Sequence, residues 1–196
     1  MTALHHDDYR DDDIRAILNE VKTVAVVGVS PLTIRPSYFV FKYLAERGYD
    51  VIPVNPGHVG KDLLGRPFVA SLKAIDRPVD MVDLFRNADR VLPAVEEALA
   101  LKPLPKVIWM QLGVRHDAAA ALAEQAGVKV VMNRCPKIEY ARLSAEIGWL
   151  GVNSRTLSSK RRPMPTTGMR LVLGQSSLAG GTLAAARRTD SKPDNS

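Results

Sequence analysis

The sequence predicts an α/β fold with a doubly wound, mainly parallel sheet in a single domain. Near-continuous runs of Val and Ile, which are typical of strands buried on both faces, alternate with amphipathic stretches of helical length. The first of these runs ends at a glycine that is followed by a loop and a helix. With 196 residues, the chain is long enough to bury one full core.

The first third of the chain predicts a helix, a strand, a second helix and a second strand. Three aspartates at 11–13 precede Ile14, Ile17 and Leu18, which indicates a short helix with acidic residues at its positive end. We expect this helix to cover an edge of the sheet. Gly48 is expected to end the second helix. The elements expected here are a helix from residue 11, strand 21–27, helix 37–47 and strand 50–54.

The pattern in residues 61–75 is weak, and we expect a turn at 65–67, a short strand at 68–69 and a short helix from residue 71. The alternation of strand and helix is clear again from residue 79 onward. The elements expected there are strand 79–85, helix 88–101, strand 106–112, helix 117–125, strand 128–132 and a closing helix 138–147.

The net charge of +6 lies entirely in the last quarter of the chain. Residues 1–150 contain 19 Lys and Arg against 19 Asp and Glu, whereas residues 151–196 contain 8 basic and 2 acidic residues and no aromatic side chain on which a base could stack. We therefore expect a basic, flexible extension rather than a nucleic-acid site. Its apolar stretches at 169–173 and 178–186 leave open that it covers apolar surface, including surface between the copies of a homodimer. The domain prediction is an N-terminal helical segment (1–20), a core domain (21–150) and this tail (151–196).

Composition excludes several classes of protein. No apolar run is long enough to span a membrane, and the acidic, polar start of the chain is unlike a signal peptide. Cys135 is the single cysteine, so an intrachain disulfide is impossible, and we expect a cytoplasmic protein. The four histidines have no spacing typical of a metal site.

The first strand leads into a loop and helix of the kind that bind phosphate. A buried parallel strand that ends at a glycine, just before a helix, directs free backbone N–H groups at an anion. Arg35 adds a positive charge to the loop, and Pro36 suits the first position of the helix. A side chain at Gly28 would block close approach of a pyrophosphate, so we expect Gly28→Val to impair binding more than folding. The candidates in this turn are Gly28, Val29, Ser30, Arg35, Pro36 and Ser37.

The pattern disfavours NAD as the ligand. The glycines of the fingerprint G-x-G-x-x-G are missing after Gly28, and the second strand ends in Asn55-Pro56 instead of the carboxylate that holds the ribose hydroxyls of NAD. A carboxylate would repel a ribose phosphate, so its absence fits NADP or coenzyme A. His58 and Lys61 could supply positive charge there, although Asn55-Pro56 also fits a plain turn.

In sheets of this kind the ligand lies beyond the carboxyl ends of the strands. Arginines, carboxamides and small residues follow the strands there, without a carboxylate pair, a Ser-His-Asp set or a metal cluster, so no catalytic residue is expected. Two of the arginines have a structural alternative to ligand binding. Arg86 could form an ion pair with Asp83 or Asp89, and Arg134 could form one with Glu139. Beyond the first turn, the candidate ligand-binding residues are Asn55, Pro56, Lys61, Phe85, Arg86, Gln111, Gly113, Asn133, Arg134 and Cys135.

Six motifs in register give the chain a family resemblance. They are A-V-V-G-V-S at 25–30, R-P-S at 35–37, V-I-P-V-N-P at 51–56, V-D-x-V-D-x-F-R at 79–86, W-x-Q-L-G at 109–113 and N-R-C-x-K-I-E at 133–139. Together they resemble the small stand-alone CoA-binding proteins of bacteria, whose domain is shared with the nucleotide-binding half of the succinyl-CoA synthetase α subunit. The resemblance covers residues 21–143.

The resemblance implies a Rossmann-like domain that binds coenzyme A or an acyl-CoA. The pyrophosphate would lie at the Gly28 loop, the adenosine near Asn55-Pro56 and Phe85-Arg86, and the pantetheine arm would run past Gln111 and Asn133. The synthetase subunit has a second domain with a phosphorylated histidine, for which we expect no counterpart here, and we expect His116 at a helix N-terminus. Non-catalytic binding, as a carrier, sensor or regulator, is therefore the expected function. The alternatives are an NADP-linked oxidoreductase and a CoA-binding subunit of a multi-chain acyl-CoA ligase.

Cys135 follows the last predicted strand, where the thiol of the pantetheine arm would arrive. A mixed disulfide between the two sulfurs would need a lowered pKa of Cys135, and Arg134 and Lys137 are nearby cations that could supply it. A small residue packed under the closing helix is the alternative.

Overall fold

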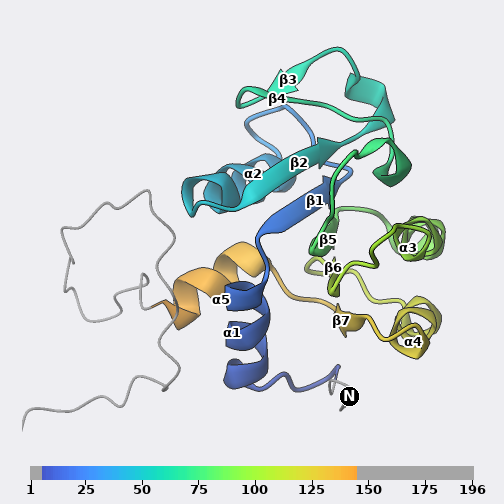
Figure 1. Cartoon of the computed structure of the whole chain (residues 1–196). Helices are drawn as coiled ribbons and strands as arrows, with labels where there is room; N and C mark the ends of the chain where they lie inside the picture. The colour runs from blue at the N-terminus through green and yellow to red at the C-terminus, as the bar shows by residue number, and fades with distance from the viewer. Residues whose placement is uncertain (1–5, 145–196) are drawn as a thin grey trace, which may run out of the picture.

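The computed structural model describes residues 6–144, and the predicted tail 151–196 lies outside them. A five-stranded parallel sheet in the order β2-β1-β5-β6-β7 forms the centre of the molecule (Figure 1). The doubly wound α/β prediction is therefore confirmed, although the strands are up to two residues shorter at each end than expected. They are β1 (Thr23–Val27), β2 (Asp50–Val54), β5 (Met81–Leu84), β6 (Val107–Met110) and β7 (Lys129–Val131).

Helices cover both faces of the sheet (Figure 1). Because successive strand residues point to opposite faces, Val24 and Val26 of β1 enter one apolar core, with α1, α2 and α5, while Ala25 and Val27 enter the other, with α3 and α4. Both cores are built mainly from residues with almost no solvent exposure. The helices are α1 (Asp11–Glu20), α2 (Pro36–Glu46), α3 (Val91–Leu99), α4 (Asp117–Gln125) and α5 (Pro136–Leu143).

The N-terminal helix packs on a face of the sheet, not along an edge as expected. Ile14, Ile17 and Leu18 are fully buried in the core that also holds residues of α2 and α5. The Tyr49 hydroxyl donates a hydrogen bond of 2.7 Å to the carbonyl of Leu18. The apolar side of α1 is therefore used to close the core.

The segment after β2 differs from its prediction. Instead of a turn at 65–67, the chain forms a small antiparallel hairpin of β3 (Asp62–Leu63) and β4 (Arg66–Pro67), which turns at Leu64 and Gly65. Both turn residues have positive φ, 52° and 74°. Short 3-10 helices flank it, η1 (Pro56–His58) and η2 (Leu72–Ala74), and a third, η3 (Ala88–Arg90), precedes α3.

Residues outside the sheet make hydrogen bonds along both of its edges. At the β2 edge, Val69 donates to the carbonyl of Pro53 at 3.0 Å and accepts from the N–H of Asn55 at 2.9 Å. Pro53 has no N–H to lose, and it is tolerated because β2 is an edge strand. At the β7 edge, the Tyr9 hydroxyl accepts the N–H of Met132 at 2.7 Å.

The strand order reverses between β1 and β5, because the chain proceeds from β1 to β2 on one side and later adds β5 on the other. Such a switch point places the loops after β1 and β5 side by side, with a crevice between them at the carboxyl end of the sheet. No helix within residues 6–144 is long and apolar enough to cross a membrane.

Candidate functional site

A cleft of about 870 Å³ opens at this switch point. Its volume lies within the range of small-molecule sites, roughly 300–1,000 Å³. Residues that follow β1, β5, β6 and β7 converge around it, as the strand-end argument predicts. Nine of the sequence-predicted residues line it, namely Gly28, Ser30, Arg35, Pro36, Ser37, Phe85, Arg86, Gln111 and Cys135.

Hydroxyl groups hold the loop between β1 and α2. The Ser37 hydroxyl oxygen accepts the N–H of Ser30 at 3.1 Å, and the Ser30 hydroxyl oxygen accepts the N–H of Leu32 at 3.2 Å. Arg35 occupies the position before α2 and makes no side-chain hydrogen bond that caps the helix. By contrast, His116 caps α4 by accepting the N–H of Ala119 at 3.1 Å, at the helix N-terminus predicted for it. The positive end of α2 is therefore left available to an anion.

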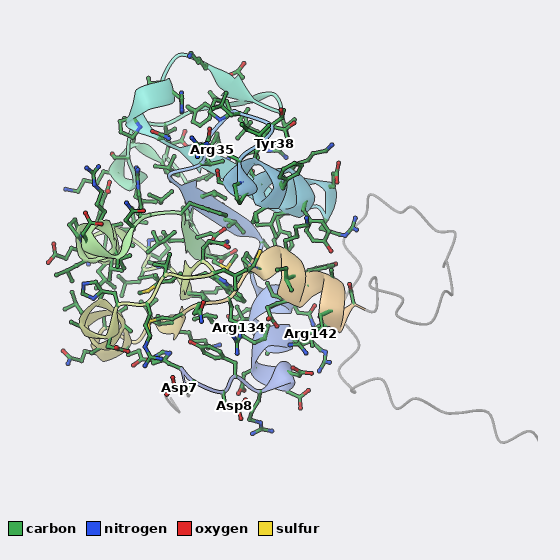
Figure 2. All side chains as sticks on the ribbon, turned by 180° about the vertical axis from the view of Figure 1, so that it is seen from behind. Asp7, Asp8, Arg35, Tyr38, Arg134 and Arg142 are labelled. Carbon is green, nitrogen blue, oxygen red and sulfur yellow. The ribbon has the colours of Figure 1, made fainter. Side chains whose placement is uncertain are left out.

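The charges that line the cleft have one sign. Arg35, Arg86 and Lys137 line it, and no Asp or Glu does. Within residues 6–144 neither arginine has an ion pair, so the partners considered for Arg86, Asp83 and Asp89, do not bind it. Figure 2 shows Arg35 near the start of α2. The cleft is therefore suited to a ligand with several negative charges.

The backbone conformation and a close backbone contact both require a glycine at position 28. Its φ is +85°, and a Cβ at this position would collide with the carbonyl oxygen of Phe85 and lie 3.2 Å from the Nε of Arg86. The contact with Phe85 joins the loops after β1 and β5. We expected Gly28→Val to impair binding more than folding, but the added side chain would collide with backbone, so a large cost in folding is expected as well.

A buried carboxyl group lies behind the floor of the cleft. Asp83 of β5 is fully buried, and the Gln111 Nε2 donates to both of its oxygens, at 2.8 and 3.0 Å. Burial raises the pKa of Asp83 to about 7, against a smaller lowering by the Gln111 hydrogen bond. Gln111 itself lines the cleft, and its side-chain oxygen Oε1 has no hydrogen bond within residues 6–144, so this atom can accept one from a ligand N–H.

Cys135 lines the cleft, but its environment does not activate it. It is 6% exposed at the start of α5. Burial raises the pKa of its thiol and Asp83 adds to this, which outweighs the backbone N–H groups of Ile138 and Lys137 and the charge of Lys137. The lowered pKa that a reactive thiol would need is therefore absent, and Cys135 fits the alternative of a small packed residue.

A family model confirms the resemblance: the model described as CoA binding domain matches residues 22–141. The chain belongs to this family. The CoA-binding domain is 38% identical, over 129 residues, to the uncharacterized protein YneT of Bacillus subtilis (strain 168), an alignment that covers 66% of this chain and 93% of YneT.

Solved structures share the fold of this CoA-binding domain. A hypothetical protein from Pyrococcus horikoshii OT3 is 39% identical with a TM-score of 0.66, and the match covers 73% of this chain and 99% of that one. A Thermus thermophilus protein is 40% identical with a TM-score of 0.64, covering 68% of this chain and 98% of the other.

Some predicted residues of the CoA-binding domain hold loops instead of lining the cleft. Asn55 donates to the carbonyl of Val29 at 2.9 Å and accepts the N–H of Gly57 at 3.1 Å, which fixes the turn after β2 to the first loop. Asn133 has a φ of +53° and accepts the N–H of Gly113 at 2.8 Å, which joins the turns after β6 and β7. The carboxamides of both residues therefore form hydrogen bonds with backbone groups of the loops.

Arg134 does not line the cleft. It pairs with Glu139 at 3.9 Å and stacks over the ring of Tyr9 at 5.5 Å, so the open alternative of a pair with Glu139 is confirmed. Figure 2 shows it well separated from Arg35. The other predicted residues outside the cleft lining are Val29, which is buried, Gly113, whose N–H is bound by Asn133, and Pro56 and Lys61, which are exposed around η1.

The prediction missed the apolar part of the lining. Exposed side chains of the first loop, α2, the turn after β6 and α5 contribute it, namely Leu32, Ile34, Phe39, Leu112 and Ile138. They carry no chemical signal in the sequence, because an apolar residue in a helix or after a strand is expected in the core. Within residues 6–144 no group of three His, Cys, Asp or Glu side chains could hold a metal ion.

Proposed function

We propose that this protein binds coenzyme A, free or acylated, and acts as a non-catalytic carrier, sensor or regulator. Three cations and no carboxylate line a cleft at the switch point of a CoA-family fold, and this observation carries the proposal. CoA carries a pyrophosphate and a ribose phosphate, so it meets such a cleft with matching charge.

The groups in the cleft fit the parts of CoA in order. Arg35, Arg86 and the uncapped start of α2 suit the pyrophosphate. The side-chain oxygen of Gln111 could accept a hydrogen bond from an amide N–H of the pantetheine arm.

The cleft supports binding over catalysis. Its lining holds no histidine or carboxylate that could act as an acid or base, and burial raises the pKa of Cys135, its one thiol. Asp83 has a raised pKa but lies beneath Gln111, fully buried.

Calorimetry and thermal shifts with the full chain test the proposal. CoA should raise the melting temperature by mass action, whereas NADPH should not. Arg35→Ala should weaken CoA binding about 10- to 100-fold, the scale of a charge-assisted hydrogen bond, with an unchanged melting temperature of the free protein because Arg35 is exposed. Arg10→Ala is the matched control, since Arg10 is exposed and lies before α1, outside the cleft.

Two results would contradict the proposal. One is an equal or larger thermal shift with NADPH, which would favour the oxidoreductase alternative. The other is a CoA affinity of Arg35→Ala within threefold of wild type, which would remove the first loop from the binding site.

A further inference from the structure

The exposed apolar residues of this protein gather at the cleft. Nine large apolar side chains are exposed within residues 6–144, and five of them line it: Leu32, Ile34, Phe39, Leu112 and Ile138. The other four, Val59, Leu64, Leu104 and Leu122, do not. Exposed apolar side chains that gather in one place, next to polar groups, mark a binding site.

Three of these residues come from the turn after β6, from α5 and from the part of α2 that lies next to α5. Leu112 follows β6, Ile138 belongs to α5, which follows β7, and Phe39 lies in α2 with its ring 5.9 Å from the Nζ of Lys137 in α5. Their exposed fractions are 55%, 45% and 49%. We call Phe39, Leu112 and Ile138 the apolar wall.

The order of the strands gives the cleft a direction. Arg86 follows β5, whereas the residues after β6 and β7 are one and two strands further along the sheet, about 5 and 10 Å away. A CoA whose pyrophosphate lies at Arg35 and Arg86 would extend its pantetheine arm past Gln111 toward Cys135. Its sulfur would then reach the side of the cleft on which the apolar wall lies.

We propose that the apolar wall binds the aliphatic acyl chain of a CoA thioester, so that the protein prefers acyl-CoA to free CoA. The inference rests on the proposed function and names its ligand class. The lining of the cleft combines cations with the apolar wall, so it complements an acyl-CoA, which is anionic at one end and apolar at the other. Free CoA ends in a thiol and would leave the wall in water.

A second copy of the chain fits the wall less well. A two-fold contact would place the same face of both copies together, and therefore two sets of Arg35, Arg86 and Lys137 in one interface. With no carboxylate in the lining, these like charges would repel one another. The acyl chain of a bound ligand brings no such repulsion.

Calorimetric titration with CoA, acetyl-CoA and octanoyl-CoA tests the inference. Wild type should bind octanoyl-CoA at least about tenfold more tightly than CoA, because a few methylenes leave water, and acetyl-CoA should resemble CoA. Leu112→Ser with Ile138→Ser should remove most of this preference, so the ratio of the affinities for octanoyl-CoA and CoA should fall at least about fivefold. Leu122→Ser is the matched control, since Leu122 is 37% exposed on α4 and lies outside the cleft.

The outcomes separate the inference from the proposed function. If the protein binds CoA and octanoyl-CoA with equal affinity, the inference is overturned and the proposed function stands. If it binds neither ligand, the inference and the proposed function are both overturned. If Leu122→Ser also loses the preference for octanoyl-CoA, the apolar wall is not the cause of that preference. Sedimentation that shows a dimer in wild type and a monomer in the double variant would assign the wall to a second copy instead. Melting temperatures of all variants, measured alongside, should stay near that of wild type because the substituted side chains are exposed.

Discussion

The charged side chains at the amino end of the sheet pair with one another, whereas the two arginines that line the cleft at its carboxyl end have no ion pair within residues 6–144. At the amino end, Asp80 accepts the N–H groups of Lys22 and Thr23 at 2.8 and 3.1 Å and pairs with Lys106 at 3.2 Å. Glu20 pairs with Lys106 and with Lys129. At the carboxyl end, Arg35 and Arg86 line the cleft unpaired. The charges at the amino end neutralise one another, whereas Arg35 and Arg86 have no opposite charge within residues 6–144.

The comparison teaches which changes should affect stability and which should affect binding. Substitutions at the amino end remove contacts that the folded chain makes with itself. Substitutions of the cleft cations remove charges that the folded chain leaves free, so they should alter affinity with little cost in stability. Gly28 and Asp83 test this division, because both lie at the carboxyl end without being cations.

The largest expected effect comes from Gly28, where the loops at the carboxyl end of the sheet are held by a close backbone contact. Gly28→Ala should lower the free energy of unfolding by at least about 4 kcal/mol, because the methyl group collides with the Phe85 carbonyl and the φ of +85° is strained. Urea denaturation measures the loss. Gly113→Ala is the control, since its φ is +78° but nothing lies within 4 Å of the added atom, and it should cost only about 1 kcal/mol. Equal losses would show that strain, not the collision, explains the requirement.

Asp83→Asn should stabilise the protein at neutral and alkaline pH. The folded pKa of about 7 lies above the unfolded value near 3.8, so the unfolded chain binds fewer protons between these values and stability falls as pH rises from about 4 to 7. The substitution keeps an acceptor for Gln111 and removes the buried charge. The expected gain is about 2–3 kcal/mol at pH 8 and none at pH 4.

Denaturation at several pH values checks the gain from Asp83→Asn. The exposed Asp89 provides Asp89→Asn as the control, with no expected change. A gain that is the same at pH 4 and pH 8 would show that the buried charge is not its cause.

Asp80→Ala gives the smallest of the three effects and tests the amino end. Burial raises the pKa of Asp80, but the Thr23 and Lys22 N–H groups and Lys106 outweigh it and hold the pKa below its ordinary value. Losing these hydrogen bonds should cost about 2 kcal/mol of stability. The CoA affinity of the folded fraction should stay within twofold, as measured by calorimetry. A large loss of affinity would break the division between the two ends. Asp76→Ala is the control, since Asp76 is 91% exposed and contacts only Arg77, at 3.7 Å.

Much of the fold could be predicted because buried parallel strands and amphipathic helices have distinct periods in the sequence. Helix 117–125 and strand 50–54 have the predicted bounds. The hairpin at 62–67 could not be predicted, because its strands of two residues are too short to show any period. The N-terminal helix was predicted as an element, but its position on a face depends on contacts with α2 and α5 that are distant in the sequence.

The candidate site could be predicted as a set of strand ends, but not residue by residue. The carboxamides of Asn55 and Asn133 have the chemistry of ligand contacts, yet backbone N–H groups of nearby turns use them. Arg134 points to Tyr9 and Glu139 because the side chains near the end of β7 divide between two sides of the strand, and a sequence does not show which side faces the cleft. Ile138 was predicted at the start of the closing helix, but α5 begins at Pro136, and Ile138 reaches solvent at the rim.

The cover on both edges of the sheet limits how this protein can associate. A strand at the edge of a sheet normally offers free N–H and C=O groups to which another chain can add as a further strand, the usual route to fibres and to domain swapping. Here the Tyr9 hydroxyl takes the N–H of Met132 beside β7, and Val69 takes the outward groups of Pro53 and Asn55 at β2. A further strand could therefore pair with these edge groups only by first breaking these hydrogen bonds.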